Sequence, residues 1–221
     1  HRTAQLVEHH ALSEPEERPR DLPSIWILTV VMFFIGMFFA SVQSGVTAFA
    51  LAQGSEGIAG LVYGAMGVTS AIAGLLTALL PTTFPLARRL VVFPVVLLVF
   101  LTPLVLLGTS GSTSLPLLYV AVMLAGAAVA PTLITAFSLG ERAVPISRLS
   151  WAMTVMASGV VLGYATSALL SGALAQEHGA IGAFLVTVAA VTAAVLVALG
   201  GYRRLHRLDL VVTRVPTSTA G

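Results

Sequence analysis

The sequence predicts an all-α membrane protein, a polytopic bundle of six transmembrane helices. Of its 221 residues, 57% are hydrophobic and only 9% are charged, and the mean hydropathy is +0.98. An ordinary soluble domain carries about 25% charged residues. A soluble fold of this length cannot hide so much apolar surface, so we exclude a cytosolic enzyme and a nucleic-acid-binding domain despite the pI of about 9.5. We expect a lipid bilayer around the chain and no nucleic-acid partner.

Six apolar stretches of sufficient length are separated by polar, Pro or Gly residues. A helix needs about 20 apolar residues to cross a bilayer core about 30 Å thick. The stretches cover residues 25–51, 57–80, 91–108, 116–139, 149–175 and 181–202, and they contain no Asp, Glu, Arg or His. The sequence is therefore divided into a tail over residues 1–22, a six-helix domain over residues 23–203 and a second tail over residues 204–221.

The positions of the basic residues, all eleven of which are Arg, test this span assignment independently. An even number of spans places both tails, the second connection and the fourth connection on one side of the membrane. Every Arg falls in these four segments, whereas the opposite connections carry Glu56 and Glu177. Because Arg-rich segments stay on the inside, we expect both termini to be cytoplasmic. Trp26, Trp151 and Tyr202 lie near span ends, as interfacial anchors do.

Motifs for catalysis or metal binding are few. The sequence has no Cys, which excludes disulfides, thiolate metal sites and cysteine nucleophiles. It also has no HExxH, P-loop or GxGxxG element, so we expect no enzymatic activity, no metal and no cofactor. Residues 108–111, Gly-Thr-Ser-Gly, match the GxSG motif of intramembrane serine proteases. However, no His lies within a span to act as the base for Ser110, so we reject this interpretation.

Four of the six spans carry polar or small residues at helical spacing, and two do not. Helices that line a path need such residues, whereas helices that face lipid can be purely aliphatic. The third span has Thr102 and the sixth has Thr187 and Thr192 as their main polar residues, so we expect these two spans to be a lipid-facing scaffold. The other four spans supply the candidates for a substrate cavity, which are Gln43, Thr47, Tyr63, Ser70, Thr135, Thr154 and Ser158.

Several span residues have a structural interpretation beside the functional one. Two pairs of glycines have the spacing that lets membrane helices pack closely, namely Gly60 with Gly64 and Gly159 with Gly163. Shaping a path is the alternative role for them. Pro131 lacks a backbone donor in the middle of its span and is expected to kink the helix. Gln43 carries an amide that is costly to leave unpaired in a membrane, so it faces either a neighbouring helix or a cavity.

Two tracts resemble one family. The first tract, residues 125–135 with 141–145, is similar to the tenth helix and the following loop of bacterial, actinobacterial-like members of the major facilitator superfamily. The second tract, residues 157–163 with 171–174 and Gly179, is similar to their eleventh helix and its exit. In each half of that fold the first, second, fourth and fifth helices line the cavity, and the polarity of the six spans matches this division. The resemblance implies the C-terminal half of a secondary transporter in the plasma membrane, one that exports a drug or metabolite, and proton coupling is one mode of transport that it allows.

The resemblance also implies a partner, because substrate binds between two six-helix halves. The N-terminal half is not in this sequence, and we expect a fragment because the chain begins with His1 rather than Met. In the loop before the third span, Arg88 and Arg89 match the family, but its Asp is absent, so no cytoplasmic latch is expected there. Gln43 stands near a position where related exporters often carry a carboxylate. An amide cannot exchange a proton, so a coupling acid would lie in the other half.

Two alternatives stay open. The first is a natural six-span protein that forms a path as a homodimer, and the second is a structural membrane protein that transports nothing. A structural membrane protein gives no role to the polar faces of the four spans or to Pro131 in the fourth span. Six further spans encoded upstream of His1 would favour the half-transporter over the homodimer.

Overall fold

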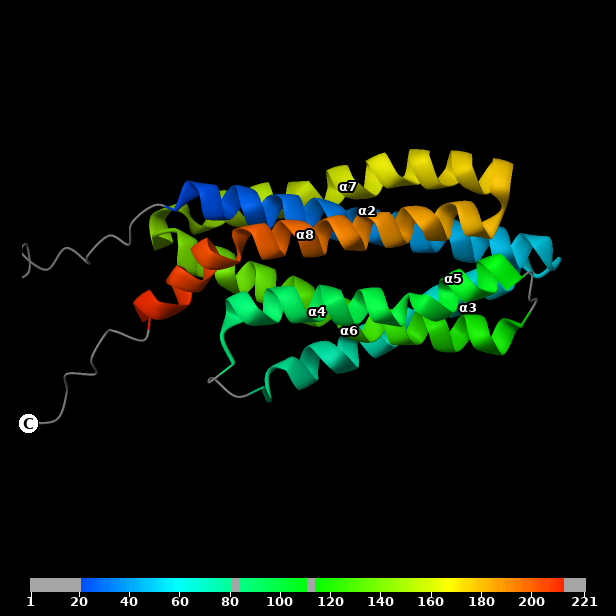
Figure 1. Cartoon of the computed structure of the whole chain (residues 1–221), viewed down its shortest axis with the longest axis horizontal. Helices are drawn as coiled ribbons and strands as arrows, with labels where there is room; N and C mark the ends of the chain where they lie inside the picture. Colours follow the sequence, from blue (N-terminus) through cyan, green and yellow to red (C-terminus); the bar gives the residue numbers. More distant parts are fainter. Residues whose placement is uncertain (1–20, 81–83, 111–113, 213–221) are drawn as a thin grey trace, which may run out of the picture.

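The computed structural model describes residues 21–80, 84–110 and 114–212 (Figure 1). Within these ranges the regular structure is helical, and six helical segments are long and apolar enough to cross a membrane. The predicted fold class is therefore confirmed, and the chain is a membrane protein. The elements in chain order are α2 (Leu22–Ala52), α3 (Glu56–Thr77), α4 (Leu86–Phe100), α5 (Thr102–Ser110), α6 (Leu115–Ala143), the 3-10 turn η1 (Ile146–Arg148), α7 (Leu149–His178) and α8 (Ala180–Val212).

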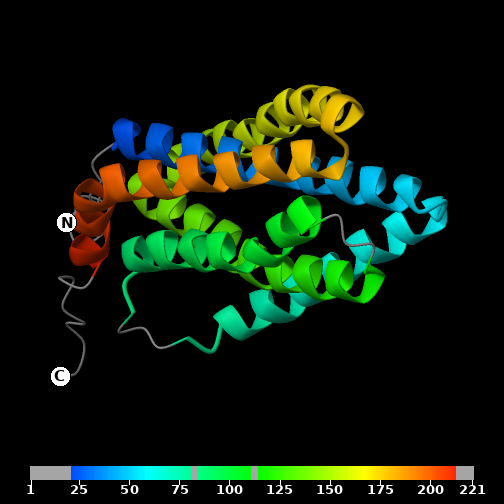
Figure 2. The ribbon, with the colours of Figure 1, turned by 45° about the vertical axis from the view of Figure 1, so that its right-hand side comes forward.

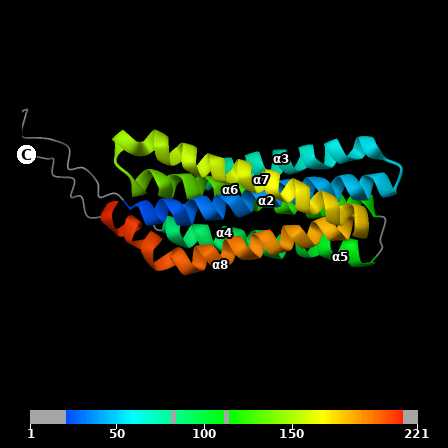
Figure 3. The ribbon, with the colours of Figure 1, turned by 90° about the horizontal axis from the view of Figure 1, so that it is seen from above.

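The helices are arranged in three layers. Figure 3 shows α3 and the first part of α7 along one side, α2 and α6 in the middle, and α4, α5 and α8 along the opposite side, toward which the second part of α7 crosses. The two middle helices are the most buried spans, and α3 is the least buried. The core consists mainly of aliphatic side chains from α2 and α6 with their neighbours. The outer layer of α4, α5 and α8 contains the two spans whose sequences are most aliphatic.

The packing between helices follows a repeated pattern. The first three spans (α2, α3 and α4 with α5) form one triplet, and the last three (α6, α7 and α8) form another. The first helix of the first triplet, α2, packs against α7 and α8 of the second. Likewise α6, the first helix of the last three spans, packs against α3 and α4 of the first three. The third spans of the two triplets, α4 and α8, also contact each other. Exchanging the triplets therefore reproduces the pattern, and because each contains an odd number of spans, the two triplets cross the membrane in opposite directions.

Glycines allow α2 and α7 to approach each other closely. A Cβ at Gly159 would lie 2.8 Å from the carbonyl oxygen of Thr29, and one at Gly163 would collide with the carbonyl oxygen of Phe33. From the other side, a Cβ at Gly36 would collide with the carbonyl oxygen of Val160. The two backbones are thus in direct contact over about one and a half turns, which a larger side chain at any of these positions would prevent.

The third span is broken, which the apolar pattern did not predict. It starts earlier than expected, at Leu86, and it divides into α4 and α5 at Leu101. Pro103 stands at the second position of α5 and has no N–H to donate to the carbonyl oxygen of the preceding turn. By contrast, α6 passes through Pro131 as one continuous helix.

Several helices extend past the apolar spans. The predicted boundary at residue 203 falls inside α8, which continues to Val212 through Arg-containing turns. The first helix begins at Leu22, directly after its N-cap Asp21. The predicted and observed boundaries differ because an apolar stretch ends where the bilayer ends, whereas a helix ends only where its backbone hydrogen bonding ends. The final turns of α8, drawn in red, turn away from the axis of that helix in Figures 1 and 2.

Candidate functional site

A cleft opens between α2 and α7 at the end of the bundle that has no Arg. Its volume is about 580 Å³. The α2 wall extends over about two turns and includes Gln43, Ser44 and Thr47, and the α7 wall includes Gly172 and Gln176. The remaining lining residues are Ala48, Leu51, Ala175 and Gly179. Among the described residues no acidic or basic side chain lines the cleft, so these residues offer neutral hydrogen-bonding groups and apolar surface.

Polar side chains connect α2 to its neighbours beside this cleft. The Tyr164 hydroxyl of α7 donates a hydrogen bond to the Gln43 amide oxygen. The hydroxyl oxygens of Ser171 and Ser44 are 3.0 Å apart. Gln43 therefore faces both a neighbouring helix and a cavity. Because its oxygen accepts from Tyr164, its amide N–H groups are the part that is left for a ligand.

The other predicted cavity residues lie elsewhere. Of the seven, only Gln43 and Thr47 line the cleft. Tyr63 and Ser70 are half-buried on α3, and Thr154 and Ser158 are exposed on α7, so these four lie on the two helices of one outer layer. Thr135 is 1% exposed inside α6, and its hydroxyl donates to the Pro131 carbonyl oxygen at 2.7 Å. This packing keeps Thr135 away from any surface of the described chain.

One face of α3 has small residues and no neighbour among the described residues. A Cβ at Gly57, Gly60, Gly64 or Gly67 would meet no other atom within 4 Å. Further along the helix, Gly74 does touch Ala130 and Ile134 of α6. Gly60 and Gly64 therefore pack against none of the described helices, unlike Gly159 and Gly163. We call these four open positions the glycine face of α3.

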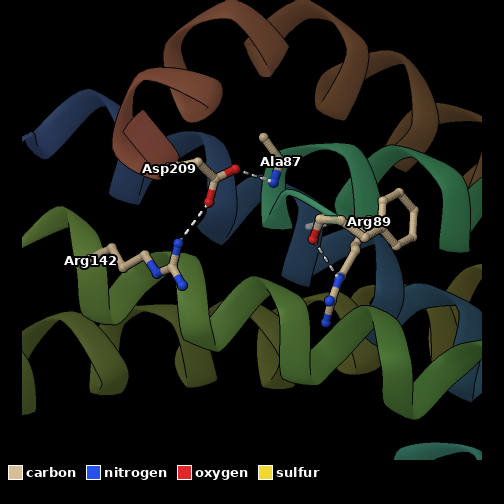
Figure 4. Close-up of polar contacts among 5 residues, drawn as sticks. Ala87, Arg89, Arg142 and Asp209 are labelled. Carbon is tan, nitrogen blue, oxygen red and sulfur yellow. Dashed lines mark hydrogen bonds and ion pairs between the residues drawn. The ribbon is translucent and has the colours of Figure 1, made fainter. Parts of the chain in front are cut away.

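At the opposite, Arg-rich end, Asp209 of α8 joins three helices (Figure 4). One carboxylate oxygen accepts from the Ala87 N–H in the first turn of α4 at 2.9 Å, and the other binds Arg142 Nη1 of α6 at 2.8 Å. Asp209 is only 7% exposed, so both contacts are partly desolvated. A carboxylate at a helix N-terminus is also stabilised by the helix dipole.

Sequence reasoning missed Asp209. No cytoplasmic latch was expected because the loop before α4 has no Asp. In the structure, the Asp209 carboxylate from near the end of the chain accepts a hydrogen bond at the start of α4. The one sequence feature that pointed to Asp209 is that it is an acidic residue close to the Arg residues of the last helix. No local sequence pattern connects it to Ala87, which is 122 residues away. In the same region the Arg88 and Arg89 guanidinium groups lie 5.8 Å and 5.4 Å from the Phe84 ring centroid.

A second carboxylate, Asp21, makes a similar junction at the same end. Its side chain accepts from the Ser24 hydroxyl at 2.7 Å, as an N-cap of α2. It also binds Arg204 of α8 at 2.9 Å, and its backbone N–H donates to the Ala143 carbonyl oxygen at 3.0 Å. The two carboxylates together connect the ends of α2, α4, α6 and α8.

No protein-family model matches the chain, and no curated protein and no solved structure matches it. The resemblance to the major facilitator superfamily therefore stays a prediction that rests on the tracts quoted above. The helix arrangement, the cleft and the two carboxylate junctions are independent of that resemblance.

Proposed function

We propose that the chain is the C-terminal half of a major facilitator superfamily transporter, which moves a small molecule by alternating access. The observation that carries the proposal is the crossed packing of the two triplets, α2 to α5 and α6 to α8. Each six-helix half of this superfamily consists of two three-helix repeats of inverted topology. Crossed packing of two oppositely directed triplets is what such a half requires.

The layers support the same proposal. A half transporter needs one side that faces its partner half across the substrate and another that faces lipid. The aliphatic third and sixth spans form one outer layer. The opposite layer, α3 and α7, carries the glycine face and the exposed Thr154 and Ser158. We assign this second side to the partner half.

The cleft supports a substrate class. Its lining has amide and hydroxyl groups beside apolar surface and lacks charged side chains. We therefore propose an uncharged or weakly polar substrate, bound in part by the Gln43 amide, and a drug-like or metabolite molecule that is exported. Because the six apolar stretches predicted from the sequence have no carboxylate, we propose that any proton coupling uses an acid in the other half.

The charge distribution supports an orientation. The helix ends with Arg in the described ranges are the start of α4, the end of α6, the start of α7 and the end of α8, all at one end of the bundle. By the positive-inside rule we assign this end to the cytoplasm of a bacterial cell and the bilayer to its plasma membrane.

The direct test of the half-transporter proposal is the coding sequence upstream of the His1 codon, translated in frame. We expect six further spans that end in a polar linker. A start codon immediately before His1 would contradict the proposal. It would favour the homodimer, for which the glycine face of α3 offers a surface of small residues, and chemical crosslinking in membranes would then test for the dimer.

A further inference from the structure

The arginines at the Arg-rich end are not equivalent. Arg142 and Arg204 are engaged by Asp209 and Asp21, and Arg89 is buried beside Phe84. In contrast, two arginines one turn apart near the end of α8, Arg203 and Arg207, are exposed. Within the part of the chain that the structure describes, no carboxylate lies within ion-pair distance of either of these two. Their charges are therefore not neutralised by a carboxylate of the described residues.

The same stripe of α8 continues into the membrane as exposed leucines. Leu196 and Leu199 are 63% and 51% exposed, and with Arg203 and Arg207 they follow steps of three, four and four residues. That spacing places all four side chains on one face of the helix. The face thus has apolar side chains within the span and guanidinium groups where the span ends.

Neighbouring contacts hold this part of α8 in place. Asp209 fixes the last turns to α4 and α6, and the Asp21–Arg204 pair fixes the turn between the two free arginines to α2. Tyr202 stacks on His206 with ring centroids 5.6 Å apart, so an aromatic pair accompanies the arginines. Aromatic side chains of this kind are typical of the membrane–water interface.

We propose that Arg203 and Arg207 bind the phosphate group of an anionic phospholipid, whose acyl chain lies along Leu199 and Leu196. Guanidinium groups bind phosphate oxygens through paired hydrogen bonds and keep their charge at any physiological pH. A free phosphate ion would use the arginines alone, whereas a lipid uses the whole stripe. The proposal needs only that the chain spans a membrane, and it does not depend on transport.

The test is native mass spectrometry of the purified full chain in an uncharged detergent. Phosphatidylglycerol, phosphatidylcholine and inorganic phosphate are the three ligands. We expect phosphatidylglycerol to remain bound at concentrations at which the other two do not. Equal binding of phosphatidylcholine would overturn the role of the arginines in selecting a charge, and equal binding of inorganic phosphate would overturn the lipid as the ligand. This comparison uses the unmodified chain, so it does not depend on the folding of a variant.

A pair of double variants locates the site. Arg203→Gln with Arg207→Gln is expected to lower the affinity for phosphatidylglycerol about 25-fold, from about fivefold for each arginine near an anionic surface. Arg88→Gln with Arg148→Gln removes the same charge from exposed side chains at the same end and is expected to lower it less than about threefold. Equal losses in both would overturn a local site in favour of a diffuse positive field. Circular dichroism verifies that both variants keep their helix content.

Discussion

At the scale of single residues, Asp209 has a role that its place near the end of the chain does not suggest. A carboxylate that is 7% exposed is stable only where its oxygens have partners. Here the two oxygens have different donors, the backbone of Ala87 and the guanidinium of Arg142. One side chain thus holds the end of α8 against the start of α4 and the end of α6.

Replacing Asp209 by Asn tests this junction. The amide keeps one acceptor but directs an NH₂ group at one of two donors, so we expect a loss of stability of about 2 kcal/mol. The measurement is the thermal unfolding midpoint of the purified chain in detergent. Glu141→Gln is the matched control, because it removes an exposed carboxylate next to Arg142 and should change stability by less than about 0.5 kcal/mol. Equal shifts for the two variants would contradict the junction.

The cleft residue Gln43 leads to a second prediction, which rests on the proposed transport function and uses the complete transporter that it implies. Gln43→Ala removes the amide from the cleft, and we expect the apparent affinity for the transported substrate to fall about tenfold. Tyr164→Phe removes only the hydroxyl that orients this amide, so a smaller fall in the same direction is expected. Transport measurements at matched expression give these values.

Thr192→Ala serves as the control for the cleft variants. Thr192 lies in the outer layer, and its hydroxyl donates to the Val188 carbonyl oxygen within α8, so its loss should leave the substrate affinity unchanged. An effect of Thr192→Ala as large as that of Gln43→Ala would argue against the assignment of the cleft.

At the scale of the elements, the glycines divide the helix faces into packed and open ones. On α7 they let the α2 backbone approach to contact distance, whereas on α3 four of them meet no atom of the described chain. The sequence spacing is the same in the two cases, because Gly60 precedes Gly64 by four residues and Gly159 precedes Gly163 by four residues. The spacing indicates a close approach of helices, but only the structure identifies which face has its partner within the chain.

Substituting Ala at one glycine of each helix is the corresponding prediction. Gly163→Ala places a methyl group against the Phe33 carbonyl, and we expect it to destabilise the chain by about 1–3 kcal/mol. Gly64→Ala meets nothing within the chain and gains helix propensity, so it should leave the stability equal or raise it by less than about 1 kcal/mol. Thermal unfolding in detergent compares the two, and the reverse order of stability would contradict the packing described for α2 and α7.

At the scale of the whole molecule, the sequence predicts the number of membrane spans better than how the helices pack. Apolar length and Arg placement are local properties, and they were sufficient for six spans and the all-helical fold. The break at Leu101 depends on a single proline, and the continuation of α8 to Val212 depends on hydrogen bonding rather than hydropathy. The bond from Ala87 to Asp209 and that from Tyr164 to Gln43 each join residues more than 120 apart. No periodicity along the chain encodes which distant helices are neighbours.

Among the seven predicted cavity residues, two line the cleft and five lie elsewhere, so polarity alone does not locate the cleft. Gln43 and Thr47 line the cleft, whereas Thr135 satisfies its hydroxyl within its own helix. A threonine in a membrane helix has that local option because its hydroxyl reaches the carbonyl four residues back. Glutamine lacks such a short reach, so a mid-span Gln indicates a cavity or an interhelical contact more reliably than a Thr.

The central claim, transport by alternating access through a path beside the cleft, is tested most directly by thiol labelling. The chain has no cysteine, so single cysteines at Gln43, Arg148 and Thr192 can be labelled with a membrane-impermeant maleimide, in cells and in inverted vesicles, in the complete transporter cleared of other cysteines. Because maleimide reacts with the hydrated thiolate, we predict that Gln43→Cys reacts from both sides, Arg148→Cys from the cytoplasmic side alone and Thr192→Cys from neither. A Gln43→Cys variant that reacts from one side only, or from neither, would contradict the account.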